Sequence, residues 1–268
     1  MNELRTRIMG ILNVTPDSFS DGGNFHDLTA ALLQAEGIIA AGADILDVGG
    51  ESTRPYAEPV SLEDELARTI PVIRTIRSTH SIPISIDTTK AEVARQALAA
   101  GADIINDISA LLKDPEMIDV VRDSDVPVII MHMQGSPSDM QDRPAYDNVI
   151  DEIVAFFTER IEWMTSEGVA RNRIILDPGI GFGKTLDHNL SIIKHLDRFK
   201  SLDLPVLLGH SRKNFLGILT GLEAEKRDLP TAVISALSVE RQADIIRVHD
   251  VASTRQALQV AEALMHAQ

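Results

Sequence analysis

Short apolar segments recur along the chain, and stretches with helical spacing separate them. Segments such as LTAALLQAEGIIAAGA and KAEVARQALAAGA place apolar residues three or four positions apart, as amphipathic helices do. Continuous apolar strands that alternate with helices are typical of parallel βαβ units, and eight such units predict a single α/β domain, a (β/α)8 TIM barrel. A doubly wound open sheet is the alternative. The predicted strands are 7–14, 44–50, 83–88, 103–109, 127–133, 173–179, 205–211 and 244–250.

Polar residues end nearly every predicted strand. Successive side chains of a strand alternate between its two faces, so the side of Asn13 is also the side of Met9 and Ile11. In a TIM barrel the carboxyl ends of the strands form the active face. One polar strand end can simply meet water, but many that converge on one mouth favour a ligand site. The residues that this alternation places toward the interior or its mouth are Asn13, Asp47, Asp87, Asn106, Met131, Asp177, Ser211, Arg247 and His249.

Composition excludes several classes of protein. The net charge of −15 argues against a nucleic-acid partner, which would need a basic face. No apolar stretch approaches the length of a membrane span, and the start of the chain does not resemble a signal peptide. The sequence has no cysteine, so we expect neither disulfides nor thiolate metal sites, and this composition fits the cytoplasm. No segment has the composition of a linker, and residues 1–268 are expected to form one domain.

Two motifs suggest chemistry that their details do not support. The segment PGIGFGKT (178–185) looks like a phosphate-binding loop, but Pro178 stands where the first glycine of that motif belongs. The histidines show no zinc-binding spacing, and we expect His26, His80 and His266 to lie on the surface. Neither motif changes the expectation of a site at the strand ends.

The chain resembles the dihydropteroate synthases, which are pterin-binding (β/α)8 enzymes of folate biosynthesis. The blocks that carry the resemblance follow the family's order from end to end, and the chain is similar to the monofunctional form. They are MGILNVTPDSFSDGG (9–23), DVGGESTRP (47–55), PISIDTTK (83–90), IINDIS (104–109), LDPGIGFGKT (176–185), GHSRKNFLG (209–217) and IIRVHDV (245–251).

The resemblance implies a transferase reaction. The pterin 6-hydroxymethyl-7,8-dihydropterin diphosphate loses pyrophosphate, and p-aminobenzoate attacks the methylene carbon to give 7,8-dihydropteroate. The family suggests a dissociative path through a cationic pterin. A pterin ring offers N–H donors on one edge and acceptors on another, which suits carboxylate, amide and ammonium groups. The resemblance assigns pterin binding to Asp47, Asp87, Asn106, Met131, Asp177, Phe182 and Lys213.

The diphosphate needs positive charge and a metal ion. The resemblance assigns its binding to Asn13, Arg54, Arg247 and His249. The Asn13 side chain presents a hard oxygen, which suits Mg²⁺, an ion that takes few protein ligands together with phosphate oxygens. We therefore expect Mg²⁺ as the cofactor, with Asn13 as its protein ligand.

Two long loops complete the implied site. Asp21, in the loop after the first strand, is assigned to stabilise the cationic carbon, and Lys213 and Arg54 are the further catalytic residues. The loops are expected to form a lid that excludes water. Binding of p-aminobenzoate is assigned to Phe19, Thr53, Pro55, Lys213 and Asn214.

The sequence departs from the family's usual pattern at two positions. Tyr56 stands in STRPYAEP where the family usually has glycine, and Asn214 follows Lys213 where serine is common. An asparagine side chain or its backbone N–H can still donate to the p-aminobenzoate carboxylate. The expectation is altered affinity for p-aminobenzoate and its sulfonamide mimics, with activity retained.

Two other functions compete with the synthase. A corrinoid-linked methyltetrahydrofolate methyltransferase would share the barrel and the pterin carboxylates, but it would not need the Asn13 metal site or the STRP loop. A non-catalytic pterin-binding protein would tolerate loss of Asp21 or Arg54, and both are present. The family is usually dimeric through helices away from the mouth, so we expect a homodimer and only small-molecule substrates as other partners.

Overall fold

Eight parallel strands form one sheet in the order β6-β5-β4-β3-β2-β1-β8-β7. The computed structural model describes residues 5–14, 23–52, 59–135, 140 and 144–267. A parallel bridge between Leu176 and Val206 links β6 to the chain just before β7, so the sheet closes into a barrel. The TIM barrel prediction is confirmed, and the open sheet is excluded. The strands are β1 (Arg7–Asn13), β2 (Ile45–Gly49), β3 (Ile84–Asp87), β4 (Ile104–Asp107), β5 (Val128–Met131), β6 (Ile174–Asp177), β7 (Leu207–Leu208) and β8 (Ile245–Val248).

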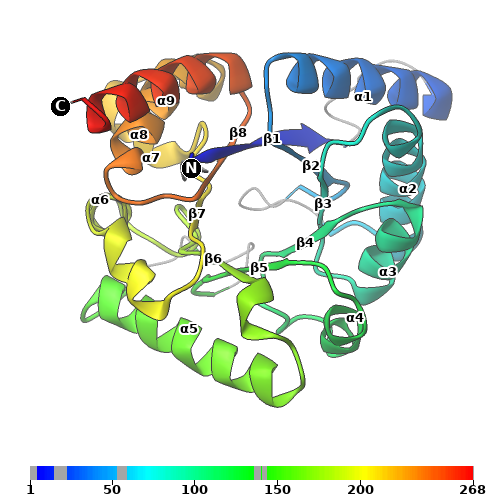
Figure 1. The fold of residues 1–268 in the computed structure, drawn as a ribbon, viewed down its shortest axis with the longest axis horizontal. Helices are drawn as coiled ribbons and strands as arrows, with labels where there is room; N and C mark the ends of the chain where they lie inside the picture. The colour runs from blue at the N-terminus through cyan, green and yellow to red at the C-terminus, as the bar shows by residue number, and fades with distance from the viewer. Residues whose placement is uncertain (1–4, 15–22, 53–58, 136–139, 141–143, 268) are drawn as a thin grey trace.

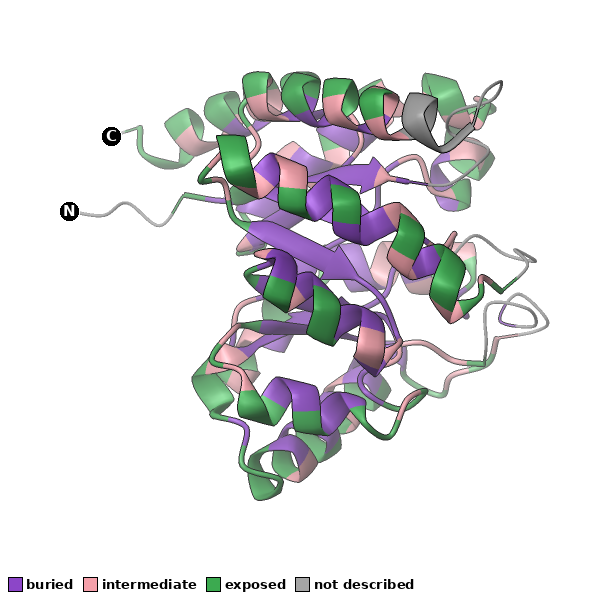
Figure 2. Ribbon diagram, turned by 90° about the vertical axis from the view of Figure 1, so that its right-hand side faces the viewer, coloured by how far each residue is buried: buried purple, intermediate pink, exposed green. Residues whose placement is uncertain are grey.

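Helices surround the barrel, and the colour in Figure 1 runs around the ring in chain order. Figure 2 shows the strands almost wholly buried, whereas the helices alternate between buried and exposed residues. No helix in the described ranges is long and apolar enough to cross a membrane. The helices are α1 (Gly23–Ala40), α2 (Leu62–Thr79), α3 (Ala91–Ala100), α4 (Met117–Asp123), α5 (Val149–Ser166), α6 (Leu186–Lys194), α7 (Asn214–Thr220), α8 (Asp228–Val239) and α9 (Val251–Met265).

The barrel interior is filled by a small apolar cluster of its own. On most strands a residue of this cluster lies two or four positions before a polar residue of the predicted site, so the alternation predicted from the sequence is confirmed. Met9, for example, shares its face with Asn13, and Ile175 shares its face with Asp177. The members of the cluster are Met9, Ile45, Ile104, Ile129, Ile175, Leu207 and Ile245.

The larger core lies between the strands and the helices. Strand residues whose side chains point outward from the barrel, such as Ile8, Leu46 and Ile86, belong to this core and are fully buried. At Gly10 the helix layer comes so close that a Cβ would overlap the side chain of Ile38 in α1. A larger residue at Gly10 would push α1 away from β1.

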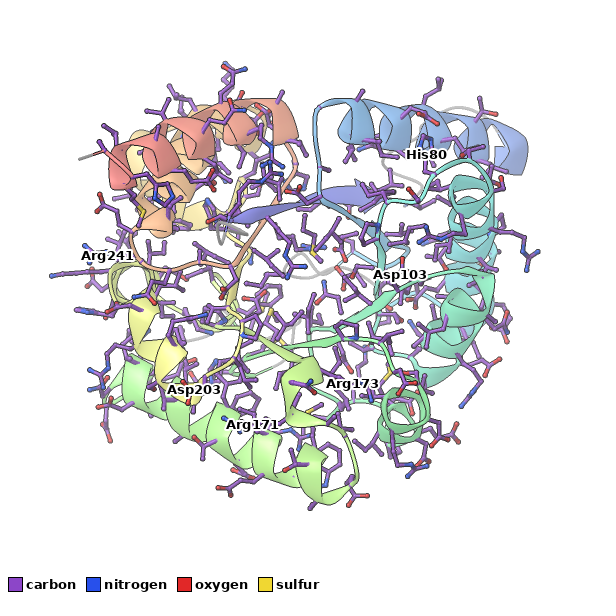
Figure 3. All side chains as sticks on the ribbon, viewed as in Figure 1. His80, Asp103, Arg171, Arg173, Asp203 and Arg241 are labelled. Carbon is purple, nitrogen blue, oxygen red and sulfur yellow. The ribbon has the colours of Figure 1, made fainter. Side chains whose placement is uncertain are left out.

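Charged residues close the amino ends of the strands. Arg77 forms an ion pair with Asp103, His80 lies 2.7 Å from Glu36, and the Nε of Arg173 donates to the Val126 carbonyl at 2.9 Å. Figure 3 labels residues of the turns at this end, including His80, Asp103 and Arg173. In TIM barrels this end serves stability, so the functional side chains are sought at the other end.

Candidate active site

Arg247 joins two carboxylates at the carboxyl ends of three strands. From β8 its Nε donates to Asp47 Oδ2 on β2 at 2.6 Å, and its terminal nitrogen donates to Asp87 Oδ2 on β3 at 2.6 Å. Asp47 is fully buried. Although burial opposes its charge, Asp47 and Asp87 raise the pKa of Arg247 above its ordinary value, so the guanidinium is always charged. This single positive charge is therefore shared between the two carboxylates on this side of the mouth.

Asp87 is a carboxyl group whose pKa lies close to neutral pH. Burial raises its pKa to about 7, the nearby Asp47 adds to the increase, and Arg247 opposes it. Asn106 on β4 lies beside it in the sheet, paired with Asp87, and its amide nitrogen is 3.4 Å from Asp47 Oδ1. These side chains combine a carboxylate that can change its charge with an amide that can both donate and accept.

Asp177, at the end of β6, faces the second cation of the site. Its Oδ1 accepts the Gly179 N–H at 2.8 Å. Burial raises its pKa, and the ammonium of Lys213 is the strongest influence in the other direction. Burial lowers the pKa of Lys213 to about 8, and Asp177 opposes this decrease. The pair can present an acceptor and a donor to the same ligand.

Phe182 and Met131 form an apolar wall beside these charges. Both are buried and belong to a small cluster with Ile108 and Met140. The Nζ of Lys213 lies 4.4 Å from the centre of the Phe182 ring. Apolar walls with a few well-placed polar groups are typical of pockets for flat aromatic ligands.

A third polar group follows β8. Ser211 Oγ lies 2.9 Å from His249 Nδ1 and accepts the backbone N–H of His249 at 3.1 Å. The sequence placed Ser211 at the mouth without giving it a role, and the structure shows that it orients His249. His249 follows Arg247 by two residues, as an anion site built from both would require.

The other predicted residues are placed only in part. Asn13 ends β1, is half-buried and pairs with Gly49 at the end of β2. Asn214 is exposed and begins α7 directly after Lys213. Six residues that carry predictions lie outside the described residues: Phe19, Asp21, Thr53, Arg54, Pro55 and Tyr56.

Sequence reasoning missed one buried pair next to the apolar wall. Lys184 and His132 are both buried, and the Lys184 Nζ lies 3.1 Å from His132 Nδ1. The segment PGIGFGKT contains Lys184, but neither its likeness to a phosphate loop nor the family resemblance assigns this lysine a role. Its three glycines Gly179, Gly181 and Gly183 all have positive φ, at 71°, 82° and 63°. That pattern of glycines was the signal for a tightly built loop.

Asp177 offers the simplest test of the site. In Asp177→Asn the side chain keeps its shape but loses the charge that accepts N–H groups. We expect the binding of a pterin to weaken by about 1.5–3 kcal/mol, the range for hydrogen bonds to charged groups. Isothermal titration calorimetry checks this, and an unchanged affinity would remove Asp177 from the pterin site.

Three comparisons agree on the relatives of this chain. The family described as pterin binding enzyme matches residues 9–249. A dihydropteroate synthase of Synechocystis sp. is 48% identical over 97% of this chain and 90% of its own length. The Escherichia coli dihydropteroate synthase is 47% identical over 97% of this chain and 92% of its own length.

Solved structures give the same result. The Yersinia pestis dihydropteroate synthase with a sulfonamide drug complex has a TM-score of 0.94 and 42% identity, and the match covers 99% of this chain and 96% of the other. The Xanthomonas albilineans dihydropteroate synthase with 4-aminobenzoic acid has a TM-score of 0.93 and 46% identity, over 98% of this chain and 94% of the other.

Proposed function

Because the chain belongs to the dihydropteroate synthase family of pterin-binding enzymes, we propose that its barrel mouth is where the pterin diphosphate and p-aminobenzoate are joined. The observation that carries this function is the full-length similarity, 48% over 97% of the chain, to a dihydropteroate synthase. A Xanthomonas albilineans relative of known structure holds 7,8-dihydropteroate, the product of that reaction, and aligns over 99% of this chain. The chain is a transferase of folate biosynthesis, and nothing favours the methyltransferase or the non-catalytic binding protein.

We assign the pterin ring to the pocket between Asp177 and the apolar wall. Asp177 and Asp87 accept N–H groups of the ring, and Asn106 serves the edge that mixes donors and acceptors. Lys213 donates to the ring acceptors, while Met131 and Phe182 pack on the ring. Asp47 was assigned to the pterin from the family resemblance, but it is fully buried under Arg247, so we propose that it positions that arginine.

Charge on the pterin changes during the reaction, and the residues respond to that change. As pyrophosphate leaves, the methylene carbon becomes cationic, and carboxylates near it stabilise the transition state more than the ground state. Asp21 is the residue that we propose for this contact, with Arg54 and Lys213 as the other catalytic groups. Exclusion of water protects the cation until the amine of p-aminobenzoate attacks.

The diphosphate is assigned to Asn13, Arg54, Arg247 and His249. No group of three or more His, Asp or Glu side chains suited to a metal occurs among the described residues. A hard amide oxygen on Asn13 fits a Mg²⁺ ion that is held mainly by diphosphate oxygens and water. We therefore propose Asn13 as the protein ligand, and the bound ion would neutralise charge on the leaving pyrophosphate.

Binding of p-aminobenzoate is proposed for Phe19, Thr53, Pro55, Lys213 and Asn214. Asn214 is exposed at the start of α7 and directly follows Lys213 in the sequence, so we propose that it meets a carboxylate at the rim. The Yersinia pestis relative was solved with a sulfonamide drug complex, and we propose that sulfonamides occupy the same place here. Tyr56 and Asn214 would then determine the affinity of the site for p-aminobenzoate and for sulfonamides.

The pKa values at the mouth predict a bell-shaped pH profile for kcat/KM. Below a pH of about 7 Asp87 gains a proton and no longer presents a charged acceptor. Above a pH of about 8 Lys213 loses its proton and its charge. Activity should therefore fall on both sides of this window. In Asp87→Asn the acid limb should disappear while the alkaline limb stays, and an acid limb that persists would assign it to another group.

We propose that two copies associate through the helices α7, α8 and α9; the resemblance suggests a dimer formed by helices away from the mouth. Large apolar side chains are exposed there, and they are Ile218, Leu219, Leu229, Val233, Leu237, Val260 and Leu264. Figure 1 shows these helices gathered at one corner of the barrel. Sedimentation velocity should give the mass of two chains, and a monomer at micromolar concentration would contradict this.

We also propose the cytoplasm as the compartment of this protein, because a charged diphosphate substrate crosses a bilayer only at high cost.

The function is tested by the formation of product. The purified protein is incubated with the pterin diphosphate, p-aminobenzoate and Mg²⁺, and 7,8-dihydropteroate is measured by chromatography and mass spectrometry. We expect product that depends on both substrates. Binding of the pterin without any product would identify a binding protein instead.

A further inference from the structure

Lys184 is a buried ammonium group that serves only neutral acceptors. Its side chain is 3% exposed, and its Nζ lies 2.9 Å from the Phe182 carbonyl oxygen, 3.3 Å from the His132 carbonyl oxygen and 3.1 Å from His132 Nδ1. Within the described part of the chain, no carboxylate forms an ion pair with it. Burial lowers the pKa of Lys184 to about 7, the charge of Asp177 opposes this decrease, and the charge of Lys213 adds to it.

His132 is held so that it can accept this bond. Its ring meets the Phe156 ring edge-on, with centroids 4.9 Å apart, and lies near Tyr146. Burial and the charge of Lys184 lower the pKa of His132 to about 3, so the imidazole is neutral and one nitrogen can accept. Lys184 thereby links the end of β5 to the backbone of Phe182.

Two peptide carbonyls of the 178–185 loop, on either side of Gly181, accept hydrogen bonds from different lysines. The Ile180 carbonyl accepts from Lys213, which belongs to the pterin site, and the Phe182 carbonyl accepts from Lys184. A Cβ at Gly179 would overlap the His132 carbonyl, so the loop lies directly on the chain that follows β5. The backbone on either side of Gly181 is therefore held by an ammonium group.

The geometry points to Lys184 as a positioning residue for the pterin site: it fixes Phe182 against Met131 and so sets the apolar wall on which the ring packs. This inference rests on the proposed binding of the pterin ring beside Phe182 and Met131. Lys184 does not touch the substrate in this account. It acts through the carbonyl of Phe182 and through His132, which directly follows Met131.

The fold does not need Lys184 to hold the loop in place. Asn189 accepts the Gly181 N–H at 2.7 Å and donates to the Thr185 carbonyl at 2.8 Å, and the Tyr146 hydroxyl donates to the Gly183 carbonyl at 2.9 Å. An apolar side chain of similar length would avoid the cost of a buried ammonium, although it would take a donor from the Phe182 and His132 carbonyls and from His132 Nδ1. We therefore attribute the presence of Lys184 at this buried position to the placement of Phe182.

Lys184→Met tests this, with Lys200→Met as the matched control. Lys200 also joins a carbonyl, that of Leu204 at 3.3 Å, and it pairs with Asp244 at 2.7 Å on the amino side of β8. Calorimetry measures the binding of the pterin diphosphate to wild type and both variants, and thermal unfolding is recorded for each. A third variant, Lys184→Gln, restores a donor without charge and serves if the Met variant fails to fold.

We expect Lys184→Met to bind the pterin about tenfold more weakly, the equivalent of one hydrogen bond to a charged group, with only a small change in Tm, because the desolvation cost that is removed and the hydrogen bonds that are lost oppose each other. Lys184→Gln should lose less, and Lys200→Met should bind as wild type does. Wild-type affinity in both Lys184 variants, or an equal loss in Lys200→Met, would overturn the inference. A wild-type protein that does not bind the pterin would instead contradict the proposed function.

Discussion

Replacing Arg247 with alanine is expected to lower the free energy of unfolding by about 3–5 kcal/mol at pH 8, the usual cost of removing one partner from a buried ion pair. Two carboxylates, Asp47 and Asp87, would be left without their cation. Both are buried, and the Arg247 side chain itself is only 19% exposed, so water can replace little of the lost interaction. Urea unfolding at constant pH measures the change.

The pH dependence of this loss identifies its cause. The pKa of Asp87 is already raised to about 7 in the folded wild type, and the variant should raise it further. A raised carboxyl pKa costs stability that builds up between the unfolded-state and folded-state pKa values, is fully present above the folded-state pKa, and vanishes once the group is protonated in both states. The extra loss in the variant should therefore shrink as the pH falls to 7 and below, where Asp87 is protonated in the folded wild type as well. An equal loss at pH 5 and pH 8 would show that packing, not charge, is responsible.

Arg255→Ala is the matched control for this variant. Arg255, on α9, pairs with Asp44 at 2.5 Å and donates to the Gly42 carbonyl at 2.6 Å, and both partners precede the amino end of β2. We expect it to cost only about 1 kcal/mol, because Asp44 is 22% exposed and keeps the Arg5 guanidinium and the Ile8 N–H as donors. Arg247→Ala should also weaken the binding of pyrophosphate and of the pterin diphosphate more than the binding of a pterin without phosphates, which loses only the contribution of Asp87. Equal losses for both kinds of pterin would limit Arg247 to a role in the fold.

Asp21→Ala is expected to slow the chemical step by a factor of about 10²–10³, as the loss of one electrostatic contact to a transition state usually does. The carboxylate would matter most after pyrophosphate begins to leave, so pterin binding should change little. Ordering of the loop can offset part of the energy, and a loss near tenfold would still fit. Single-turnover rates of dihydropteroate formation measure the effect.

The control for Asp21→Ala is Asp17→Ala, which removes a carboxylate from the same loop sequence. It should keep the wild-type rate. If Asp21→Ala also keeps that rate, Asp21 does not stabilise the cation, and its loop serves only to cover the site.

The barrel and the direction of its side chains could be predicted because they follow from local pattern. Continuous apolar runs gave the strands, and alternation placed Asp177 and Asn106 at the mouth with Ile175 and Ile104 beneath them. The bounds of the strands follow less directly from the pattern. The predicted strand 205–211 is too long, because β7 is only Leu207–Leu208. The chain beyond Leu208 turns into a loop, which brings Ser211 to His249.

Long-range partners could not be predicted in the same way. Arg247 and Asp47 are 200 residues apart, and no local pattern states that a guanidinium will bridge the ends of β2 and β3. The bond from Lys184 to His132 depends on how a glycine loop folds over β5, which spacing alone does not reveal. The roles of Asp21 and Arg54 come from the family resemblance and lie outside the described residues.

Release of pyrophosphate without p-aminobenzoate tests most directly whether this site works by stabilising a pterin cation. The wild-type protein is mixed with the pterin diphosphate and Mg²⁺ alone, and pyrophosphate is followed over a single turnover. We predict release at a rate comparable with turnover, because the carboxylates at the mouth stabilise the cation before any amine attacks. Release that begins only when p-aminobenzoate is added would show direct displacement and would contradict this mechanism.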